Sequence, residues 1–349
     1  MENKRISPLK AGVIEGCLIG GAIGDAFGAP IEFYEDGYIF YKYGENGVTE
    51  LQLYGGIAHI SDDTQMSLFT ADGLLDARAR FEEPTLDEYV ESIYHSYLDW
   101  LYTQDKDVGL AKGRENRPLL QVKELFARRA PGRTCISALA SGRCGRLDWR
   151  LNNSKGCGGV MRVAPIGVYL AQIPSMTVCD AALLGARAAA ITHSHELGYI
   201  PAAFLSAMIY ELTKGKDLSA AYMRAKETTG SLFAEYSELN ACLDLAERAV
   251  DLAKNQADVD DLENIRELGQ GWVAEETLAI ALYCAFKYPE DFEKAMIASA
   301  NHSGDSDSTA AVTGNVLGTY LGLQGIPAKM VDVIELKEVI LSLSKQMYM

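Results

Sequence analysis

The sequence predicts an all-α fold in one large domain that spans residues 1–349. Apolar residues recur at helical spacing in most of the long segments, whereas runs that alternate between apolar and polar residues are scarce. No linker rich in proline or glycine divides the chain, and no repeat of about 20–50 residues indicates a solenoid. The sequence also lacks a βαβ rhythm and a GxGxxG motif after a strand, which excludes a dinucleotide-binding fold.

Seven segments follow the helical pattern, in which apolar residues fall on one stripe of the helix surface. The expected helices are residues 64–79, 86–102, 176–191, 197–212, 238–252, 273–286 and 292–300. The best candidates for β-strands are residues 39–43 and 48–53. Residues 254–266 are polar and are expected to form an exposed loop with a short helix.

Two further segments, one near each end of the chain, carry a glycine at every fourth position. These glycines are Gly12, Gly16, Gly20, Gly24 and Gly28 near the start, and Gly314, Gly318 and Gly322 near the end. Glycine costs about 1 kcal/mol relative to alanine at an interior helix position, so a compensating interaction is needed. The i, i+4 spacing creates a smooth groove that another helix backbone can approach closely. We therefore expect all eight glycines to lie inside helices in the middle of the bundle.

The composition excludes several classes of protein. Hydrophobic residues make up 48% and charged residues 23% of the 349 residues, as in globular domains. The net charge of −16 repels phosphate, so the chain is not expected to bind nucleic acid. The most hydrophobic stretch, residues 11–31, contains Glu15 and Asp25, so no membrane span is expected. Without a signal-peptide pattern the protein is expected to be cytoplasmic, and the sequence leaves its oligomeric state open.

The first acidic motif is Ser61-Asp62-Asp63-Thr64, at the start of the expected helix 64–79. Serine and aspartate are good N-caps, and acidic residues in a first turn interact favourably with the helix dipole. Capping needs only one such residue, however, and two adjacent carboxylates repel each other unless a positive charge lies between them. A helix cap and a metal site therefore both stay open for this motif.

The second acidic motif is Gly304-Asp305-Ser306-Asp307-Ser308-Thr309, which also precedes a helical segment. Asp-x-Asp places two carboxylates on one turn, and the neighbouring hydroxyls add neutral oxygen ligands, a donor set suited to Mg²⁺, Mn²⁺ or Ca²⁺. A similar pattern forms the nucleophile motif of haloacid-dehalogenase-like phosphatases, but there it follows a hydrophobic strand near the start of an α/β domain. Here it follows a helical segment near the C-terminus, which favours a metal site.

Three other groups of residues could contribute to a site. Glu32 lies between apolar neighbours at the expected end of a helix, where it is either a carboxylate with a shifted pKa or a solvent-facing residue. Gly156, Gly158 and Gly159 form a glycine-rich stretch whose N–H groups could bind a phosphate, although a plain loop fits equally well. His193 is either a substrate contact or a histidine that ends a helix.

Together and in this order, the motifs resemble those of the ADP-ribosylglycohydrolase family. The resemblance covers residues 10–325 and rests on residues 16–33, 61–64, 107–109, 132–135, 156–162, 192–193, 272–279 and 304–309. It implies a large all-helical domain with a binuclear Mg²⁺ or Mn²⁺ site at its centre. It also implies a hydrolase that cleaves the bond between ADP-ribose and an acceptor side chain.

The resemblance further implies a role for individual residues through the motifs that they match. The implied metal ligands are Ser61, Asp62, Asp63, Asp305, Asp307 and Ser308, with Thr309 as the alternative to Ser308. The implied catalytic residues are Glu32, Asp63 and Asp107. The implied substrate contacts are Asp107, Gly109, Gly156, Gly158, Gly159, Met161 and His193.

The substrate implied by the resemblance is an ADP-ribosylated protein, with an N-glycosidic arginine linkage as the first expectation and ADP-ribose as the product. Other ADP-ribosyl conjugates stay open, namely serine-linked ADP-ribose, O-acetyl-ADP-ribose, ADP-ribosylated nucleic acid or a toxin-modified protein. A non-catalytic structural protein on the same fold is the remaining alternative. Clustered carboxylates argue against it, because they repel each other when no metal is bound.

Overall fold

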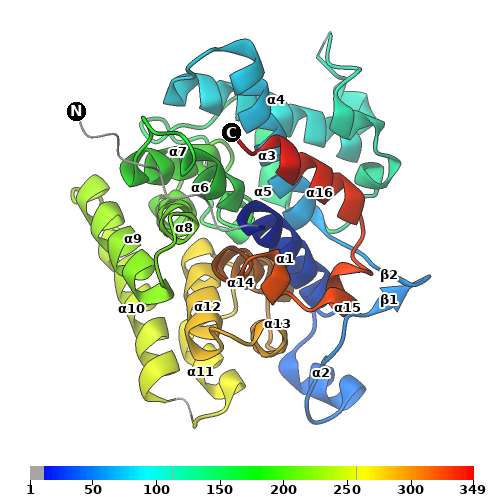
Figure 1. The fold of residues 1–349 in the computed structure, drawn as a ribbon, viewed down its shortest axis with the longest axis vertical. Helices are drawn as coiled ribbons and strands as arrows, with labels where there is room; N and C mark the ends of the chain where they lie inside the picture. Colours follow the sequence, from blue (N-terminus) through cyan, green and yellow to red (C-terminus); the bar gives the residue numbers. More distant parts are fainter. Residues whose placement is uncertain (1–11, 112, 257) are drawn as a thin grey trace.

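Two helices from opposite ends of the chain form the centre of the molecule. The structure is a computed structural model that describes residues 12–111, 113–256 and 258–349, and most of these residues are helical (Figure 1). Helix α1 (Val13–Gly28) is buried at every residue except Glu15, and α14 (Ser306–Leu321) is buried from Ser306 to Thr319. The expected central position of the two glycine segments is therefore confirmed.

The backbones of α1 and α14 are in direct contact. A Cβ atom added to Gly20 would lie 2.3 Å from the carbonyl oxygen of Gly314, and one added to Gly24 would lie 2.0 Å from the carbonyl oxygen of Ala310. Neither distance leaves room for a methyl group, so this close approach requires glycine. The contact between two nearly fully buried helices offsets the conformational cost of the glycines.

Two of the eight glycines lie at the helix ends instead of inside the helices, so the expectation was wrong for them. Gly12 precedes α1 with φ 75°, and Gly322 follows α14 with φ 74°. Both angles fall in the left-handed region, which a residue with a Cβ atom rarely adopts. These two positions need glycine for backbone conformation and not for an interior helix contact.

The remaining helices surround this central pair (Figure 1). The N-terminal part of the chain supplies α2 (Asp36–Tyr43), α3 (Asp62–Arg80), α4 (Leu86–Gln104) and α5 (Arg133–Ala140). The middle supplies α6 (Ala164–Leu170), α7 (Val178–Ala190), α8 (Glu196–Thr213), α9 (Leu218–Leu232) and α10 (Leu239–Asn255). The C-terminal part supplies α11 (Asp261–Leu268), α12 (Ala274–Lys287), α13 (Phe292–Ala300), α15 (Ala328–Val331) and α16 (Lys337–Gln346). Their buried apolar residues form one continuous core, so the chain is one large domain.

All seven helices expected from apolar spacing are confirmed, and their ends lie within three residues of the expected positions. They are α3, α4, α7, α8, α10, α12 and α13. None of the described helices is both long and apolar enough to span a bilayer. The cytoplasmic location stays a prediction.

The strand predictions were largely wrong. Residues 39–43 belong to α2, in which Ile39 is the buried residue. A short run of aromatic and aliphatic residues fits both the helical and the strand period, and Asp36 in the first turn favours a helix start. Of residues 48–53, only Leu53 lies in a strand, β1 (Leu53–Tyr54), which pairs antiparallel with β2 (Ile57–Ala58). The expected loop at 254–266 contains the start of α11.

Candidate metal centre

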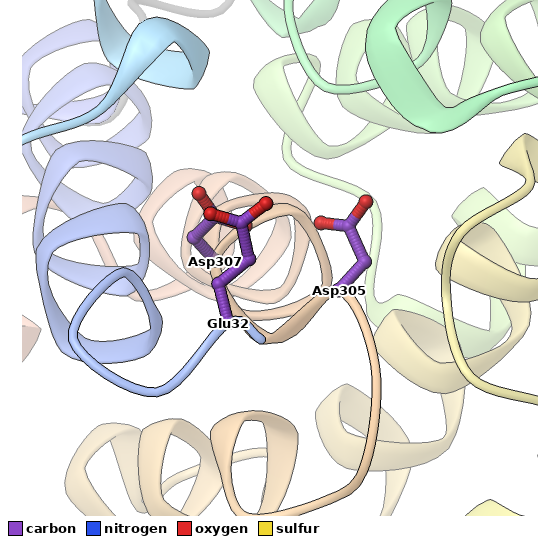
Figure 2. A group of neighbouring side chains, drawn as sticks. All are labelled: Glu32, Asp305 and Asp307. Carbon is purple, nitrogen blue, oxygen red and sulfur yellow. The ribbon is translucent and has the colours of Figure 1, made fainter. Parts of the chain in front are cut away.

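The packing of α1 against α14 brings Glu32 close to the second acidic motif. Because the helices run antiparallel, Gly28 at the end of α1 packs against Ser306 at the start of α14. The turn after α1 then places Glu32 beside Asp305 and Asp307. One carboxylate oxygen from each of the three lies within 4.8 Å of the others, and Figure 2 shows all three directed into the same space.

Helix α3 brings the first acidic motif to the same place. Asp25, a buried residue of α1, accepts hydrogen bonds from the N–H of Ser61 at 2.9 Å and of Thr64 at 3.0 Å, and from the Thr64 hydroxyl at 2.5 Å. These bonds fix the first turn of α3 against α1. Asp62 and Asp63 are buried in that turn and line the same cavity as the other carboxylates.

Both acidic motifs are also helix caps. The Ser61 hydroxyl accepts a hydrogen bond from the N–H of Asp63 at 3.3 Å, and the Asp305 carboxylate accepts one from the N–H of Ser308 at 3.3 Å. The capping interpretation of the sequence is therefore confirmed, but it does not account for every oxygen. Asp63 is buried, and its Oδ1 atom has no hydrogen-bond partner. An unpaired buried carboxylate oxygen calls for a ligand.

The carboxylates are held together without a compensating positive charge from the protein. Burial and repulsion from Asp307 raise the pKa of Asp25 to about 7 and that of Glu32 to about 10. Burial also raises the pKa values of Asp62, Asp63 and Asp305 well above the usual range. Within the described ranges, no lysine or arginine forms an ion pair with any of them. Such a set of oxygen donors fits a hard divalent cation, whose charge would remove the repulsion.

The structure distinguishes between the two hydroxyl candidates on α14. Ser308 lines the cavity together with Asp305 and Asp307. The Thr309 hydroxyl donates to the carbonyl oxygen of Ser299 at 2.8 Å and lies 2.9 Å from His302 Nε2, so it is engaged on the other side of the helix. Of the two hydroxyl residues, Ser308 is therefore the one that lines this cavity, and its role as a metal ligand stays a prediction.

A cavity of about 600 Å³ lies over the carboxylates. Its walls include four of the residues that the sequence singled out as substrate contacts, namely Gly156, Gly158, Met161 and His193. The segment before α12 connects the glycine segment to the start of α14. On one side, Cys157 N–H donates to the carbonyl oxygen of Trp272 at 3.2 Å. On the other side, Asp305 N–H donates to the carbonyl oxygen of Gln270 at 2.8 Å. One rigid framework thus holds both the acidic cluster and the glycine wall.

A family model for ADP-ribosylglycohydrolase matches residues 9–349 of the chain. The chain belongs to the ADP-ribosylglycohydrolase family. Among relatives, it is 25% identical over 326 residues to the ADP-ribosyl-[dinitrogen reductase] glycohydrolase of Rhodospirillum rubrum, covering 92% of this chain and 90% of that one. It is 28% identical over 204 residues to the human ADP-ribosylhydrolase ARH3, covering 52% of this chain and 54% of that one.

A solved structure described as an ADP-ribosylglycohydrolase-related protein complex has the same fold. Its TM-score is 0.58 at 24% sequence identity, with 97% of each chain covered. Family membership supports a hydrolase that removes ADP-ribose, in agreement with the resemblance found in the sequence.

His193 lies in the cavity wall as a neutral imidazole. Burial lowers its pKa to about 3, and its Nδ1 atom lies 2.8 Å from the hydroxyl of Thr192. Arg162 donates to the same hydroxyl at 2.7 Å and stacks over the ring of Tyr97. His193 can therefore contact a substrate by hydrogen bonding but not as a cation.

Three of the implied substrate contacts lie elsewhere in the described structure. Asp107 and Gly109 are exposed, at and just after a short 3₁₀ helix (Lys106–Val108), and neither is among the described residues that line the cavity. Gly159 is buried against α8, where an added Cβ atom would lie 2.6 Å from the carbonyl oxygen of Gly198. The roles of Asp107 and Gly109, including the catalytic role of Asp107, stay predictions.

Several residues in or next to the cavity have no role implied by the sequence motifs. Asp25 is an acidic residue within an apolar, glycine-rich segment, which is unusual, but the motifs imply no role for it. Cys157 donates its S–H to Asp305 Oδ2 at 2.8 Å. Arg128 and Arg133 line the cavity with exposed side chains and form no ion pair in the described structure. Arg133 and Cys157 belong to segments on which the resemblance rests, but only the fold shows that these residues line the cavity.

A pair of aromatic side chains at the cavity lies in two of the segments on which the resemblance rests, but neither had a role of its own. Phe33 and Trp272 are stacked, with ring centroids 5.8 Å apart and planes inclined by 22°. They line the same cavity and remain 69% and 39% exposed. The residues are far apart in the sequence, so no local pattern could have paired them.

Proposed function

We propose that the protein hydrolyses the N-glycosidic bond between ADP-ribose and an arginine side chain of a modified protein, with two Mg²⁺ or Mn²⁺ ions bound. The observation that carries the proposal is the meeting of three acidic turns in one cavity, where no described lysine or arginine forms an ion pair with them. The proposed metal ligands are Ser61, Asp62, Asp63, Asp305, Asp307 and Ser308. The unpartnered Oδ1 of buried Asp63 supports this assignment.

Glycosidic cleavage needs stabilisation of positive charge that develops at the sugar carbon, and a nucleophile to attack it. Two divalent ions, when bound, supply charge that orients the ribose hydroxyls and lowers the pKa of water. Glu32 is the most exposed carboxylate of the cluster, at 9%, and it borders the cavity. We assign it, with Asp63, the task of moving protons between the cluster and the substrate.

The other walls of the cavity suit the remainder of an ADP-ribosyl group. The side chains of Arg128 and Arg133 provide positive charge for the pyrophosphate. Gly156 and Gly158 leave the backbone open to close approach by a ligand. These local features explain how a chain with net charge −16 can bind an anionic substrate.

The test is release of ADP-ribose from matched peptides that carry arginine-linked or serine-linked ADP-ribose, with Mg²⁺ or with EDTA. We expect Mg²⁺-dependent release from the arginine conjugate, and faster release than from the serine conjugate. Release from the serine conjugate alone would move the function to an O-linked substrate. Release from neither, with metal binding shown by calorimetry, would overturn the proposal. Absence of metal binding as well would favour the non-catalytic structural protein.

A further inference from the structure

Phe33 and Trp272 stack on each other, and both remain exposed in the described part of the chain. Soluble proteins rarely leave neighbouring large aromatic side chains in water, and such patches usually mark binding sites. At 69% exposed, Phe33 contributes little to the core, and Trp272 is 39% exposed. The stacking places the two rings next to each other on the cavity wall.

Both rings line the same cavity as the carboxylates Glu32 and Asp305. Phe33 directly follows Glu32 in the chain. Trp272 accepts a backbone hydrogen bond from Cys157, whose thiol donates to Asp305. The aromatic pair therefore lies on the wall of the cavity that holds Glu32 and Asp305.

The arginines that line the cavity lie in a different segment of the chain from the two aromatic residues. Arg128 and Arg133 flank Gly132, whose N–H donates to Asp62 at 3.0 Å. On the aromatic side, Glu32 and Asp305 are the neighbouring charged groups. The cavity therefore presents an anion-binding segment and a separate aromatic surface with acidic neighbours.

We propose that Phe33 and Trp272 form the acceptor subsite and that they bind the planar cationic guanidinium of an ADP-ribosylated arginine. This inference rests on the proposed function. A glycosylated guanidinium stays flat and positively charged, and it can stack on an aromatic face while nearby carboxylates complement its charge. The pyrophosphate at the other end of the substrate is drawn to the arginines, which sets the direction of binding. A serine acceptor offers neither a plane nor a charge, so the subsite discriminates against it.

The experiment compares Trp272→Leu and Phe33→Leu with the wild type, using the arginine and serine conjugates and free ADP-ribose. We expect each variant to lower kcat/KM for the arginine conjugate about tenfold, mainly through KM, a size typical for loss of a cation–π contact. Serine-conjugate kinetics and the affinity for ADP-ribose should change by less than about twofold. Trp149→Leu is the matched control, because Trp149 is 44% exposed and lies outside the cavity lining.

The outcomes separate this subsite from the proposed function. Unchanged kinetics on the arginine conjugate would overturn the subsite while the function stands. An equal loss of ADP-ribose affinity would also overturn it, because the rings would then hold part of the ADP-ribose. If the wild type cleaves neither conjugate, the proposed function fails, and direct binding decides the subsite. ADP-ribosyl-arginine must then bind the wild type about tenfold more tightly than Trp272→Leu, and equal affinities would overturn the subsite. Thermal unfolding of each variant verifies the fold.

Discussion

The contact between α1 and α14 has two different parts, one where glycines pack closely and one where carboxylates meet. Around Gly20 and Gly24 the helix backbones touch, every neighbour is buried, and packing favours the folded state. At the end of the pair, the same close approach forces Glu32, Asp305 and Asp307 together, where burial and repulsion raise the pKa values of Glu32 and Asp305. Tight packing at one end thus supports an electrostatically unfavourable cluster at the other, and a bound cation would relieve it.

The largest expected effect comes from Asp307→Asn. We expect Mg²⁺-dependent turnover to fall at least about 1,000-fold, or about 4 kcal/mol, because a metal-coordinating charge is lost. In contrast, the metal-free variant should be more stable than the wild type by about 1 kcal/mol, since repulsion within the cluster decreases. Kinetics and urea unfolding in EDTA measure the two effects.

The matched control for this variant is Asp99→Asn, at a buried aspartate that contacts Arg114 at 2.5 Å. Removing that charge should lower the free energy of unfolding by about 2 kcal/mol, because it leaves a partly buried arginine with only a 4.0 Å contact to Asp76. A stability loss in Asp307→Asn as large as that in Asp99→Asn would show that the cluster is not electrostatically unfavourable.

The glycine end is tested by Gly24→Ala. The new Cβ atom would lie 2.0 Å from the carbonyl oxygen of Ala310, so the helices must separate. We expect the free energy of unfolding to fall by about 3 kcal/mol, with or without Mg²⁺. Gly37→Ala in α2 is the control, because a Cβ atom there meets nothing within 4 Å, and it should not destabilise the protein. Equal effects of the two substitutions would contradict the close backbone contact.

The third prediction concerns pH. Because the pKa of Asp25 is raised to about 7 and that of Glu32 to about 10, their contribution to metal-free stability is complete below pH 4 and is lost as pH rises toward those values. Metal binding displaces these protons, so Mg²⁺ should stabilise the protein by about 2 kcal/mol more at pH 8 than at pH 5. The buried histidines change stability with pH in the opposite direction, but they do so equally with and without metal. The difference between the measurements in Mg²⁺ and in EDTA therefore reports on the carboxylate cluster. A stabilisation that does not change with pH would contradict the metal assignment.

The smallest expected effect comes from Cys157→Ser. The serine hydroxyl can still donate a hydrogen bond to Asp305, so kcat should change by less than about threefold, with no measurable change in stability. A loss of more than about tenfold would show that the carboxylate end depends on the thiol itself. Steady-state kinetics and thermal unfolding measure both.

The parts of the fold that could be predicted are those encoded over short stretches. Apolar spacing predicted seven helices, and the glycine repeat predicted the central pair, because both signals are local. The strand at 39–43 was wrong, since a short apolar run fits either period. Motifs also indicated the carboxylates, because two of the three acidic groups are compact helix starts.

The rest of the site depends on tertiary contacts that a linear pattern does not contain. Asp25 acts on a turn almost 40 residues away, at Ser61 and Thr64. Phe33 and Trp272 meet after the segment before α12 has joined the start of α14, where Asp305 N–H donates to the carbonyl oxygen of Gln270 at 2.8 Å. Asp107 shows the converse case, since its motif was recognisable but its side chain is exposed on a short 3₁₀ helix.

The most direct test of the central claim is a count of the metal ions that the three acidic turns hold. Mn²⁺ titration of the full chain, followed by calorimetry and electron paramagnetic resonance, should give two bound ions per chain with magnetic coupling between them. In Asp305→Asn at least one ion should be lost. A wild-type chain that binds no Mn²⁺, or an Asp305→Asn variant that binds it as tightly as the wild type, would contradict the account.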